Sequence, residues 1–568
     1  MSKRNSRLAL LTLFFPLFAN AMIDMRNANY SDSWIDLQAN SAGFDLKVQR
    51  TYNSRTLFSG IFGFGWCTDF ETSLKITAEN TLRITECGAG FELDYTPAKY
   101  DGKDLDKNIS LIMTEVKKRN KGKDNRYFTN LENDIRTDSA LREEFAKQLN
   151  ITGSVSKNTK YLANGRSNDF VTYDGATYVR TLPNGTYQKF SKNGQLIQMS
   201  DRNGNFIKIA YNGDKILTVT DNAGTSLQFK YYNNSKYVKQ VVGPRGLSAT
   251  YKYKGENLVS INNAWKNTYT HEYDDLYNMT KATYPDKTFI ALTYDKDKDW
   301  VTSFKDRRSC KESYTYSSDE KDPLNNYSSE VVKVCGGKVT NKSSYSFWHK
   351  TKKDGSRYLA RSKAVINGQT VDTTYHEEFG KPTEIVRDDV TSRFGYYSNG
   401  LLKTKIDPNH AYNYKYDNNC AKVSLLTVVI TPPPAVADTK GSKDRKPTKE
   451  ATQTLKTAFS YDSKRCNLVA AKSSTGQTVS LAYDMKGRIA RITDQSKKIV
   501  TITYDERFGK PAVVSRPGLG TIKFKYKPDG TMDKFDSQDE PLVAIQVANI
   551  FSNLLEIIAP ATTESNNI

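Results

Sequence analysis

Hydrophobic and polar residues alternate in short segments along most of the chain. In the segment 521–527, Ile522, Phe524 and Tyr526 share one face and lysines share the other. Alternation with a period of two predicts β-strands that have one buried face. The segment 499–504 follows the same pattern. We therefore predict a protein built mainly of strands.

Tyrosine recurs near the end of these segments at an almost constant step. In three runs along the chain the step is 20 to 22 residues. A period of this length indicates one supersecondary unit that is repeated, each copy burying its apolar face on the next. Asn-Gly pairs such as Asn203-Gly204 favour the positive φ angles of tight hairpin turns, so we predict one antiparallel hairpin per period. We assign a structural role to the repeat tyrosines Tyr211, Tyr231, Tyr253, Tyr273, Tyr294, Tyr316, Tyr375, Tyr396, Tyr416, Tyr461, Tyr483, Tyr504 and Tyr526.

The predicted fold is all-β, with stacked antiparallel hairpins that form a β-spiral or a partial shell, a small helical insertion and a C-terminal helix. Aspartate follows several repeat tyrosines, as in Tyr273-Asp274 and Tyr504-Asp505. Because these carboxylates recur with the repeat, we interpret them as hydrogen-bond acceptors in turns rather than as acid–base groups.

Three segments interrupt the repeats. In the first, Leu141, Phe145 and Leu149 predict one amphipathic helix, either packed on the sheet or free to bind a partner. The second is rich in proline and lysine, which predicts a solvated loop or a contact with an anionic surface. The third segment, at the C-terminal end, predicts a helix that caps or plugs the spiral, self-associates or contacts a membrane surface. The predicted organisation is 1–21 signal peptide, 22–98 N-terminal β block, 99–168 charged and partly helical insertion, 169–420 β-spiral, 421–460 Pro/Lys-rich loop, 461–530 β-spiral and 531–568 C-terminal amphipathic helix and tail.

The first 21 residues have the features of a secretory signal peptide. Three basic residues precede an apolar run at 8–18, and Ala-Asn-Ala at 19–21 forms a cleavage site. A short buried helix or an anchor is the alternative. We expect a mature chain that begins near Met22 and is exported to the periplasm, the cell surface or the medium. No later stretch is apolar for the roughly 18 residues that a membrane-spanning helix needs.

Six cysteines are expected to form structural disulfides in an exported protein. Six cysteines allow 15 connectivities, and pairing of neighbours is favoured because each successive pair falls within one or two periods. Metal binding is the rival, but the chain has no C-x-x-C pair and only 4 His, so we expect no metal site. The expected pairs are Cys67–Cys87, Cys310–Cys335 and Cys420–Cys466.

A search for chemistry finds no catalytic cluster, no phosphate-binding loop and no cofactor motif. We therefore expect no catalytic residue, no cofactor and no enzymatic activity. The formal net charge is +20, and removal of three basic residues with the signal peptide leaves 20 − 3 = 17 positive charges. Such a surface favours anionic partners through a salt-sensitive attraction. Nucleic acid is disfavoured because the basic residues are dispersed and no recognition module is evident.

One motif in the N-terminal block carries a family resemblance. It consists of Arg50, Tyr52, Asn53, Ser54 and Arg55, followed by Gly63, Gly65 and Trp66. With the tyrosine period, it resembles the RHS/YD-repeat family, which includes bacterial polymorphic toxins, the cocoon-forming subunits of Tc toxins and animal teneurins. The resemblance covers roughly residues 30–98 and 170–530. It implies a spiral of β-strands that can wrap into a hollow shell, which in toxin members encloses a C-terminal toxin.

The chain departs from the toxin pattern near its end. Its Asp-Pro pairs, Asp322-Pro323 and Asp407-Pro408, lie far from the Asp-Pro-x-Gly position of the family's self-cleavage motif, and 42 residues follow Tyr526. We therefore predict an exported, non-enzymatic scaffold that acts in cell-surface or envelope interactions and binds an anionic glycan, an envelope polymer or a protein partner. The alternative is a carrier shell that encloses a separately encoded effector.

Overall fold

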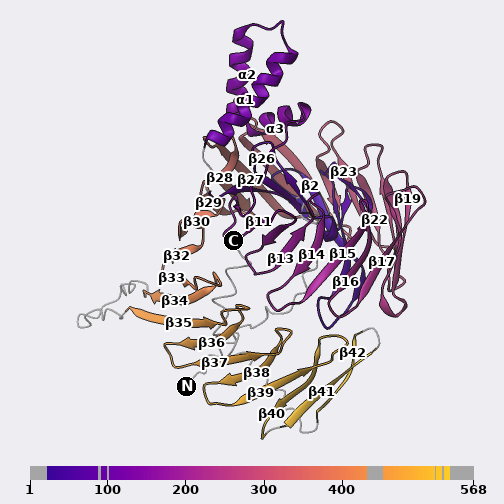
Figure 1. Cartoon of the computed structure of the whole chain (residues 1–568), viewed down its shortest axis with the longest axis vertical. Helices are drawn as coiled ribbons and strands as arrows, with labels where there is room; N and C mark the ends of the chain where they lie inside the picture. The colour runs from indigo at the N-terminus through magenta and orange to yellow at the C-terminus, as the bar shows by residue number, and fades with distance from the viewer. Residues whose placement is uncertain are drawn as a thin grey trace.

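The computed structural model describes residues 22–86, 91–98, 102–431, 452–518, 520–527 and 530–537. About 53% of the described residues lie in strands, and 36 strands form one antiparallel sheet, which confirms the predicted all-β fold (Figure 1). The strands pair in chain order, and β7 at one end is not hydrogen-bonded to β42 at the other, so the described sheet is open. The predicted signal peptide, residues 432–451 of the predicted Pro/Lys-rich loop and the predicted C-terminal helix lie outside the described residues.

The sheet begins at residue 73, before the helical insertion, and not at residue 169 where the repeats were expected to start. We call residues 73–366 the first turn of the spiral and residues 369–537 the second turn. The strands of the first turn are β7 (Ser73–Ile76), β8 (Leu82–Glu86), β9 (Phe91–Pro97), β10 (Lys160–Ala163), β11 (Phe170–Tyr173), β12 (Tyr178–Thr181), β13 (Tyr187–Phe190), β14 (Leu196–Ser200), β15 (Phe206–Asn212), β16 (Lys215–Asp221), β17 (Ser226–Tyr231), β18 (Val238–Val242), β19 (Ser248–Lys254), β20 (Asn257–Asn262), β21 (Thr268–Tyr273), β22 (Met279–Thr283), β23 (Phe289–Tyr294), β24 (Val301–Lys305), β25 (Lys311–Ser318), β26 (Asn326–Cys335), β27 (Lys338–Thr351) and β28 (Arg357–Ile366). Those of the second turn are β29 (Gln369–Tyr375), β30 (Pro382–Arg387), β31 (Val390–Tyr396), β32 (Leu402–Asp407), β33 (His410–Tyr416), β34 (Val423–Ile430), β35 (Gln453–Tyr461), β36 (Leu468–Ser473), β37 (Thr478–Tyr483), β38 (Ile489–Asp494), β39 (Ile499–Tyr504), β40 (Pro511–Arg516), β41 (Gly520–Tyr526) and β42 (Met532–Ser537).

The repeat tyrosines form a ladder of hydrogen bonds between successive hairpins. The hydroxyl of Tyr231 donates to the Ile216 carbonyl, and Ile216 is the strand partner of Tyr211 one repeat earlier. This relation recurs along the spiral, over oxygen–oxygen distances of 2.5 to 3.0 Å. Each tyrosine thus supplies a partner for a carbonyl next to a β-bulge, where the regular ladder is interrupted. Tyr375 differs, since its hydroxyl lies 2.9 Å from Ser362 Oγ.

The turns between strands also follow the repeat. Asp274 Oδ1 accepts hydrogen bonds from the backbone amides of Leu276 and Asn278, which is the turn geometry expected of a repeat aspartate. In most Asn-Gly turns only the glycine takes a positive φ, as at Gly204 with φ of 89°. The turn between β28 and β29 has both predicted left-handed residues, with φ of 50° at Asn367 and 90° at Gly368.

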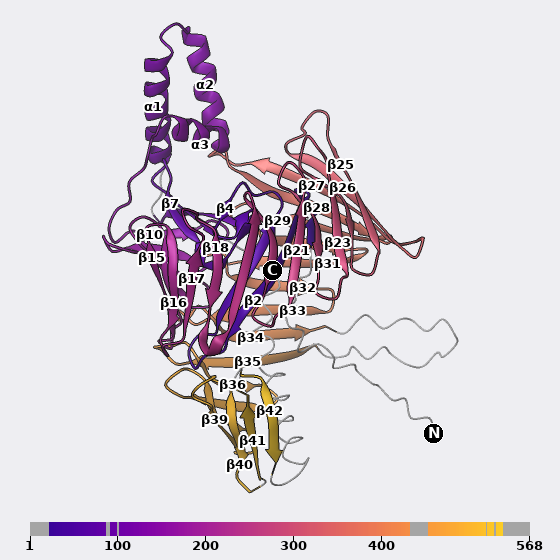
Figure 2. The same ribbon diagram turned by 90° about the vertical axis from the view of Figure 1, so that its right-hand side faces the viewer.

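The N-terminal block fills the concave side of the first turn (Figure 2). Its strands are β1 (Met22–Asp24), β2 (Asn29–Ala39), β3 (Leu46–Asn53), β4 (Ser59–Gly60), β5 (Gly63–Phe64) and β6 (Trp66–Cys67). Backbone carbonyls of Ile61, Asp36 and Ala28 accept hydrogen bonds from amides of the spiral at residues 238, 264 and 301. The main hydrophobic core joins this block to the inward side chains of the first turn, so one sheet face is buried by the chain's own beginning.

The second turn runs along the loops at one edge of the first turn. Asn467 donates to Asn203 at 2.9 Å, across 264 residues, and Asn205 donates to the Lys486 carbonyl at 3.1 Å, across 281 residues. Arg245 stacks on the ring of Phe508 at 5.2 Å. One turn of the spiral therefore takes about 264 to 281 residues at these contacts.

Three α-helices lie within the described residues and project from the shell (Figures 1 and 2). They are α1 (Gly102–Arg119), α2 (Asn125–Thr137) and α3 (Ser139–Gln148). The predicted helix through Leu141 and Phe145 corresponds to α3, while α1 and α2 were not predicted. The three pack together around a separate small core that includes Ile109, Ile112 and Ile135.

Candidate functional site

The family motif forms a buried polar centre between the N-terminal block and the spiral. Arg50 on β3 donates from Nε and Nη2 to the carboxylate of Asp36 on β2, and both side chains are fully buried. The guanidinium also lies over the Trp66 ring, 4.5 Å from its centroid. Although burial disfavours its charge, the Asp36 carboxylate raises the pKa of Arg50. The centre is a desolvated ion pair, which is costly to disrupt.

The other motif residues fasten this centre to the repeats. Trp66 donates from Nε1 to the Tyr273 hydroxyl at 2.9 Å, and the Tyr52 hydroxyl accepts from the Met279 amide at 2.8 Å. Arg55 donates to the carbonyl of Lys298 at 2.6 Å. The motif residues are thus brought together with spiral residues more than 200 positions away.

Three smaller motif residues shape the same region. The Ser54 hydroxyl accepts from the Tyr30 amide at 2.9 Å, and Asn53 accepts from the amide of Arg55 at 3.1 Å. Gly63 has a φ of 103°, and a Cβ on it would lie 2.5 Å from the Glu256 carbonyl oxygen. Gly65 has a φ of 77°, and a Cβ on it would lie 2.7 Å from the Tyr52 ring. Glycine is required where backbone and ring approach in this way.

His271 is the titratable group of this centre that most resembles a catalytic side chain. Burial lowers the pKa of His271 to about 3, helped by the positive charge of Arg50. Its Nδ1 lies 3.2 Å from the Leu258 carbonyl oxygen, and only about 3% of the residue is exposed. A neutral, enclosed imidazole of this kind packs in the core and does not reach a substrate.

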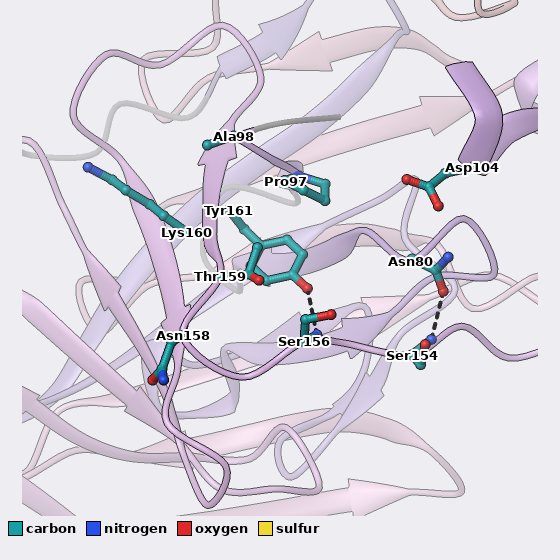
Figure 3. A pocket seen from close by; sticks show the side chains of 10 residues that line it. All are labelled: Asn80, Pro97, Ala98, Asp104, Ser154, Ser156, Asn158, Thr159, Lys160 and Tyr161. Atoms are coloured by element: carbon teal, nitrogen blue, oxygen red, sulfur yellow. Dashed lines mark hydrogen bonds between the residues drawn. The ribbon is translucent and has the colours of Figure 1, made fainter. Parts of the chain in front are cut away.

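A pocket of about 590 Å³ lies at the base of the helical insertion (Figure 3). Tyr161 accepts a hydrogen bond from the Ser156 amide at 3.2 Å, and Asn80 accepts one from the Ser154 amide at 2.8 Å. The lining residues are Asn80, Pro97, Ala98, Asp104, Ser154, Ser156, Asn158, Thr159, Lys160 and Tyr161. The lining holds one carboxylate, Asp104, and one lysine, Lys160, and neither His nor Cys. No group that could hold a metal ion is found among the described residues.

Two of the expected disulfides are present. Cys310 is bonded to Cys335, and Cys420 to Cys466. Cys87 lies outside the described residues, so the expected pairing of Cys67 with Cys87 stays a prediction. Disulfides persist in oxidising compartments, so the two bonds indicate an extracellular or otherwise exported protein.

Asp32 couples the N-terminal block to pH. Its carboxylate accepts from the Ser33 amide at 2.7 Å and from the Tyr30 hydroxyl at 3.2 Å. Burial raises the pKa of Asp32 from 3.8 to about 7, although these hydrogen bonds and Arg50 act against the shift. Burial likewise raises the pKa of Glu71 to about 7.

We expect Asp32→Asn to weaken the dependence of stability on pH. A folded pKa above the unfolded one gives a stabilisation that is complete below about pH 4 and is lost as pH rises through 7. The wild type therefore loses stability on going from pH 4 to pH 8, and the variant loses less, by about 1–4 kcal/mol. Urea unfolding at several pH values measures this difference. The matched control is Asp297→Asn, which changes an exposed carboxylate. If the free energy of unfolding of Asp32→Asn fell between pH 4 and pH 8 as much as that of the wild type, the raised pKa of Asp32 would be contradicted.

Charge is unevenly distributed on the helical insertion. At its base, Arg136 pairs with Asp106 at 2.6 Å, Arg83 with Glu143 at 2.5 Å and Arg142 with Glu79 at 2.5 Å. The far end, between α1 and α2, carries exposed basic residues that the sequence analysis did not single out. The run Lys117-Lys118-Arg119 followed by Lys121 and Lys123 is visible in the sequence.

Comparisons with known proteins give limited matches. The model of the family described as "Domain of unknown function (DUF6531)" matches residues 20–91, which include the motif residues. No curated protein matches the sequence at significant similarity. Among the described residues, no helix combines the length and the apolar character needed to cross a membrane.

Several solved structures of Tc toxins are similar in part. One is the Tc holotoxin pore of Photorhabdus luminescens with a substitution in its TccC3 component, at 11% identity and a TM-score of 0.32, covering 87% of this chain and 30% of that chain. Another is TcdB2-TccC3 without its hypervariable C-terminal region, at 10% identity and a TM-score of 0.35, covering 89% and 29%. This chain thus spans less than a third of their length. The matched family model is confined to the N-terminal block.

Proposed function

We propose that this chain is an exported, non-enzymatic YD-repeat scaffold that binds an anionic partner at the cell surface or in the envelope. The observation that supports this best is the filling of the first turn by the N-terminal block. A cavity filled by the chain itself has no room for a cargo or a substrate, which leaves the outer surface and the projecting helices for partners. The excess of 83 basic over 63 acidic residues favours an anionic partner.

Export in this proposal rests on two independent features. The apolar run with an Ala-Asn-Ala site predicts cleavage before Met22. The disulfides Cys310–Cys335 and Cys420–Cys466 require an oxidising compartment to persist. The periplasm, the cell surface and the medium all satisfy both conditions.

One observation favours a carrier shell as the second candidate. The second hydrophobic cluster is built from strands β31 to β41 of the second turn, and its described members include none from the N-terminal block. Residues such as Ile492 and Val500 are fully buried there. These side chains are already covered within the chain, so the carrier version of the function places a separately encoded polypeptide beside the second turn, whose hydrophobic cluster includes no described residue of the N-terminal block.

Native mass spectrometry of the protein purified from its own host, without reducing agent, tests both candidates. For the scaffold we expect a chain that begins at Met22 and carries no second polypeptide at fixed stoichiometry. Binding to envelope extracts should weaken steeply as salt rises, because exposed charges are screened. A second polypeptide at fixed stoichiometry would favour the carrier, and an unprocessed N-terminus would contradict export.

A further inference from the structure

The tip of the helical insertion is a strongly basic surface. We define the basic tip as the six cationic residues at the end of α1, in the following turn and at the start of α2: Lys117, Lys118, Arg119, Lys121, Lys123 and Arg126. All six are exposed. The segment 117–126, which contains these six residues, holds one carboxylate, Asp124. Six positive charges and one negative charge give the segment a net charge of +5.

The cations of the basic tip are not used to hold the insertion together. In the described part of the chain, Lys118 alone among the six forms an ion pair, with Glu115 at 3.9 Å. At the base of the insertion, Arg136 and Arg142 of the helices are paired with carboxylates at 2.5 to 2.6 Å. Cations at the end of α1 favour the helix dipole, but Lys121, Lys123 and Arg126 lie beyond that helix. Their charge is therefore available to a partner.

Aromatic rings lie among these cations. Tyr127 is 38% exposed, and the Lys123 ammonium lies 5.4 Å from its ring centroid. Lys117 lies 5.8 Å from the ring of Phe128, which packs edge-on against Tyr127. Tyrosine and basic side chains together are typical of surfaces that contact the headgroup region of a bilayer.

The shape of the hairpin indicates which anionic partner the tip fits. Both views show α1 and α2 extending away from the sheet and ending in the turn that connects them (Figures 1 and 2). With 18 residues, α1 is about 27 Å long, several times the Debye length of about 8 Å. The described pocket lies at the base of the hairpin and not at its tip. A cluster of cations at the end of a projecting hairpin can contact a flat array of phosphates without obstruction from the sheet.

We propose that the basic tip binds the anionic headgroups of a lipid bilayer and so holds the shell at a membrane surface. This inference rests on the proposed scaffold function and names its partner class. Each Lys or Arg near an anionic bilayer increases the partitioning of a protein onto that bilayer by about fivefold. Of the six cations, Lys118 is the least available to a headgroup, because it pairs with Glu115. The one carboxylate of the tip, Asp124, is the N-cap of α2 and accepts a hydrogen bond from the Tyr127 amide at 2.8 Å.

Vesicle flotation with the processed full chain tests the proposal. The probe is a vesicle of phosphatidylcholine with phosphatidylglycerol, compared with phosphatidylcholine alone. We expect binding to the anionic vesicles only, and a loss of about a hundredfold in partitioning for the triple variant Lys121→Gln, Lys123→Gln and Arg126→Gln. The matched control removes three exposed charges from the spiral instead: Lys230→Gln, Lys252→Gln and Lys523→Gln. The control should bind within about threefold of the wild type.

The other outcomes are equally decisive. If both triple variants lost vesicle binding equally, binding would depend on the net charge of the whole surface and the basic tip would have no special role. If neither variant lost binding, the proposal would be overturned. Binding to an acidic polysaccharide but not to anionic vesicles would assign the tip to a glycan instead. Circular dichroism and thermal unfolding test whether both variants are folded. We expect both to be folded, because the substituted side chains are exposed. Any of these failures leaves the scaffold function standing, because native mass spectrometry tests that function without lipid.

Discussion

Replacing Asp36 by alanine is expected to lower the free energy of unfolding by about 3–5 kcal/mol. The substitution leaves the Arg50 guanidinium buried without the carboxylate that accepts its two hydrogen bonds. Removal of one partner from a buried ion pair exposes the full cost of desolvating the other. Urea unfolding in non-reducing buffer, followed by the fluorescence of Trp34 and Trp66, measures the change in midpoint.

A double variant separates loss of the pair from loss of packing. Asp36→Leu with Arg50→Met removes both charges and keeps most of the volume, so we expect it to be less destabilised than Asp36→Ala. The exposed pair of Arg361 with Asp372 is the second control, and Asp372→Ala there should cost less than about 1 kcal/mol. If Asp36→Ala were as mild as Asp372→Ala, the buried pair would not be a stabilising centre of the block.

The second large effect is expected at Gly194, where the sheet folds back on its own beginning. The Leu74 amide donates to the Gly194 carbonyl at 2.9 Å, and a Cβ on Gly194 would lie 1.8 Å from the Leu74 carbonyl oxygen. Gly194→Ala therefore forces β7 away from the β13–β14 turn in addition to placing alanine at a φ of 81°. We expect a loss of about 3 kcal/mol or more in the free energy of unfolding.

Gly204 provides a matched control for this substitution. Gly204 has a similar φ of 89° in the hairpin turn between β14 and β15, but no atom lies within 4 Å of a Cβ placed on it. Gly204→Ala should cost about 1–2 kcal/mol, from the backbone conformation alone. Equal melting temperatures for the two variants would show that the contact with Leu74 does not hold the first strand in place.

The local part of the fold could be predicted because its determinants are local. Alternation around Tyr231 identifies the strand, and the turn residues identify the hairpin. The acceptor of its hydroxyl, the Ile216 carbonyl, is only 15 residues away. The helix α1 could also have been found, because Ile109, Ile112 and Val116 follow a helical spacing within a charged segment.

The arrangement of the N-terminal block could not be read from the sequence. The contact of Trp66 with Tyr273 joins residues 207 positions apart, and no periodic pattern indicates which repeat faces which motif residue. The motif itself was recognised, but its burial inside the first turn depends on the curvature of the sheet. The basic tip was missed for a different reason, since a run of basic residues alone does not reveal that, within the described part of the chain, one of the six forms an ion pair.

The contacts between the two turns impose a counting rule on the evolution of this chain. Asn203 meets Asn467 across 264 residues, so the number of hairpins between them decides which loops become neighbours. A repeat gained or lost inside this interval would bring a different hairpin opposite Asn203, with unmatched side chains. A repeat added beyond β42 would lie outside this interval and leave the contact of Asn203 with Asn467 in place. Lineages related to this chain should therefore vary in repeat number at the end of the spiral and keep it constant within the interval.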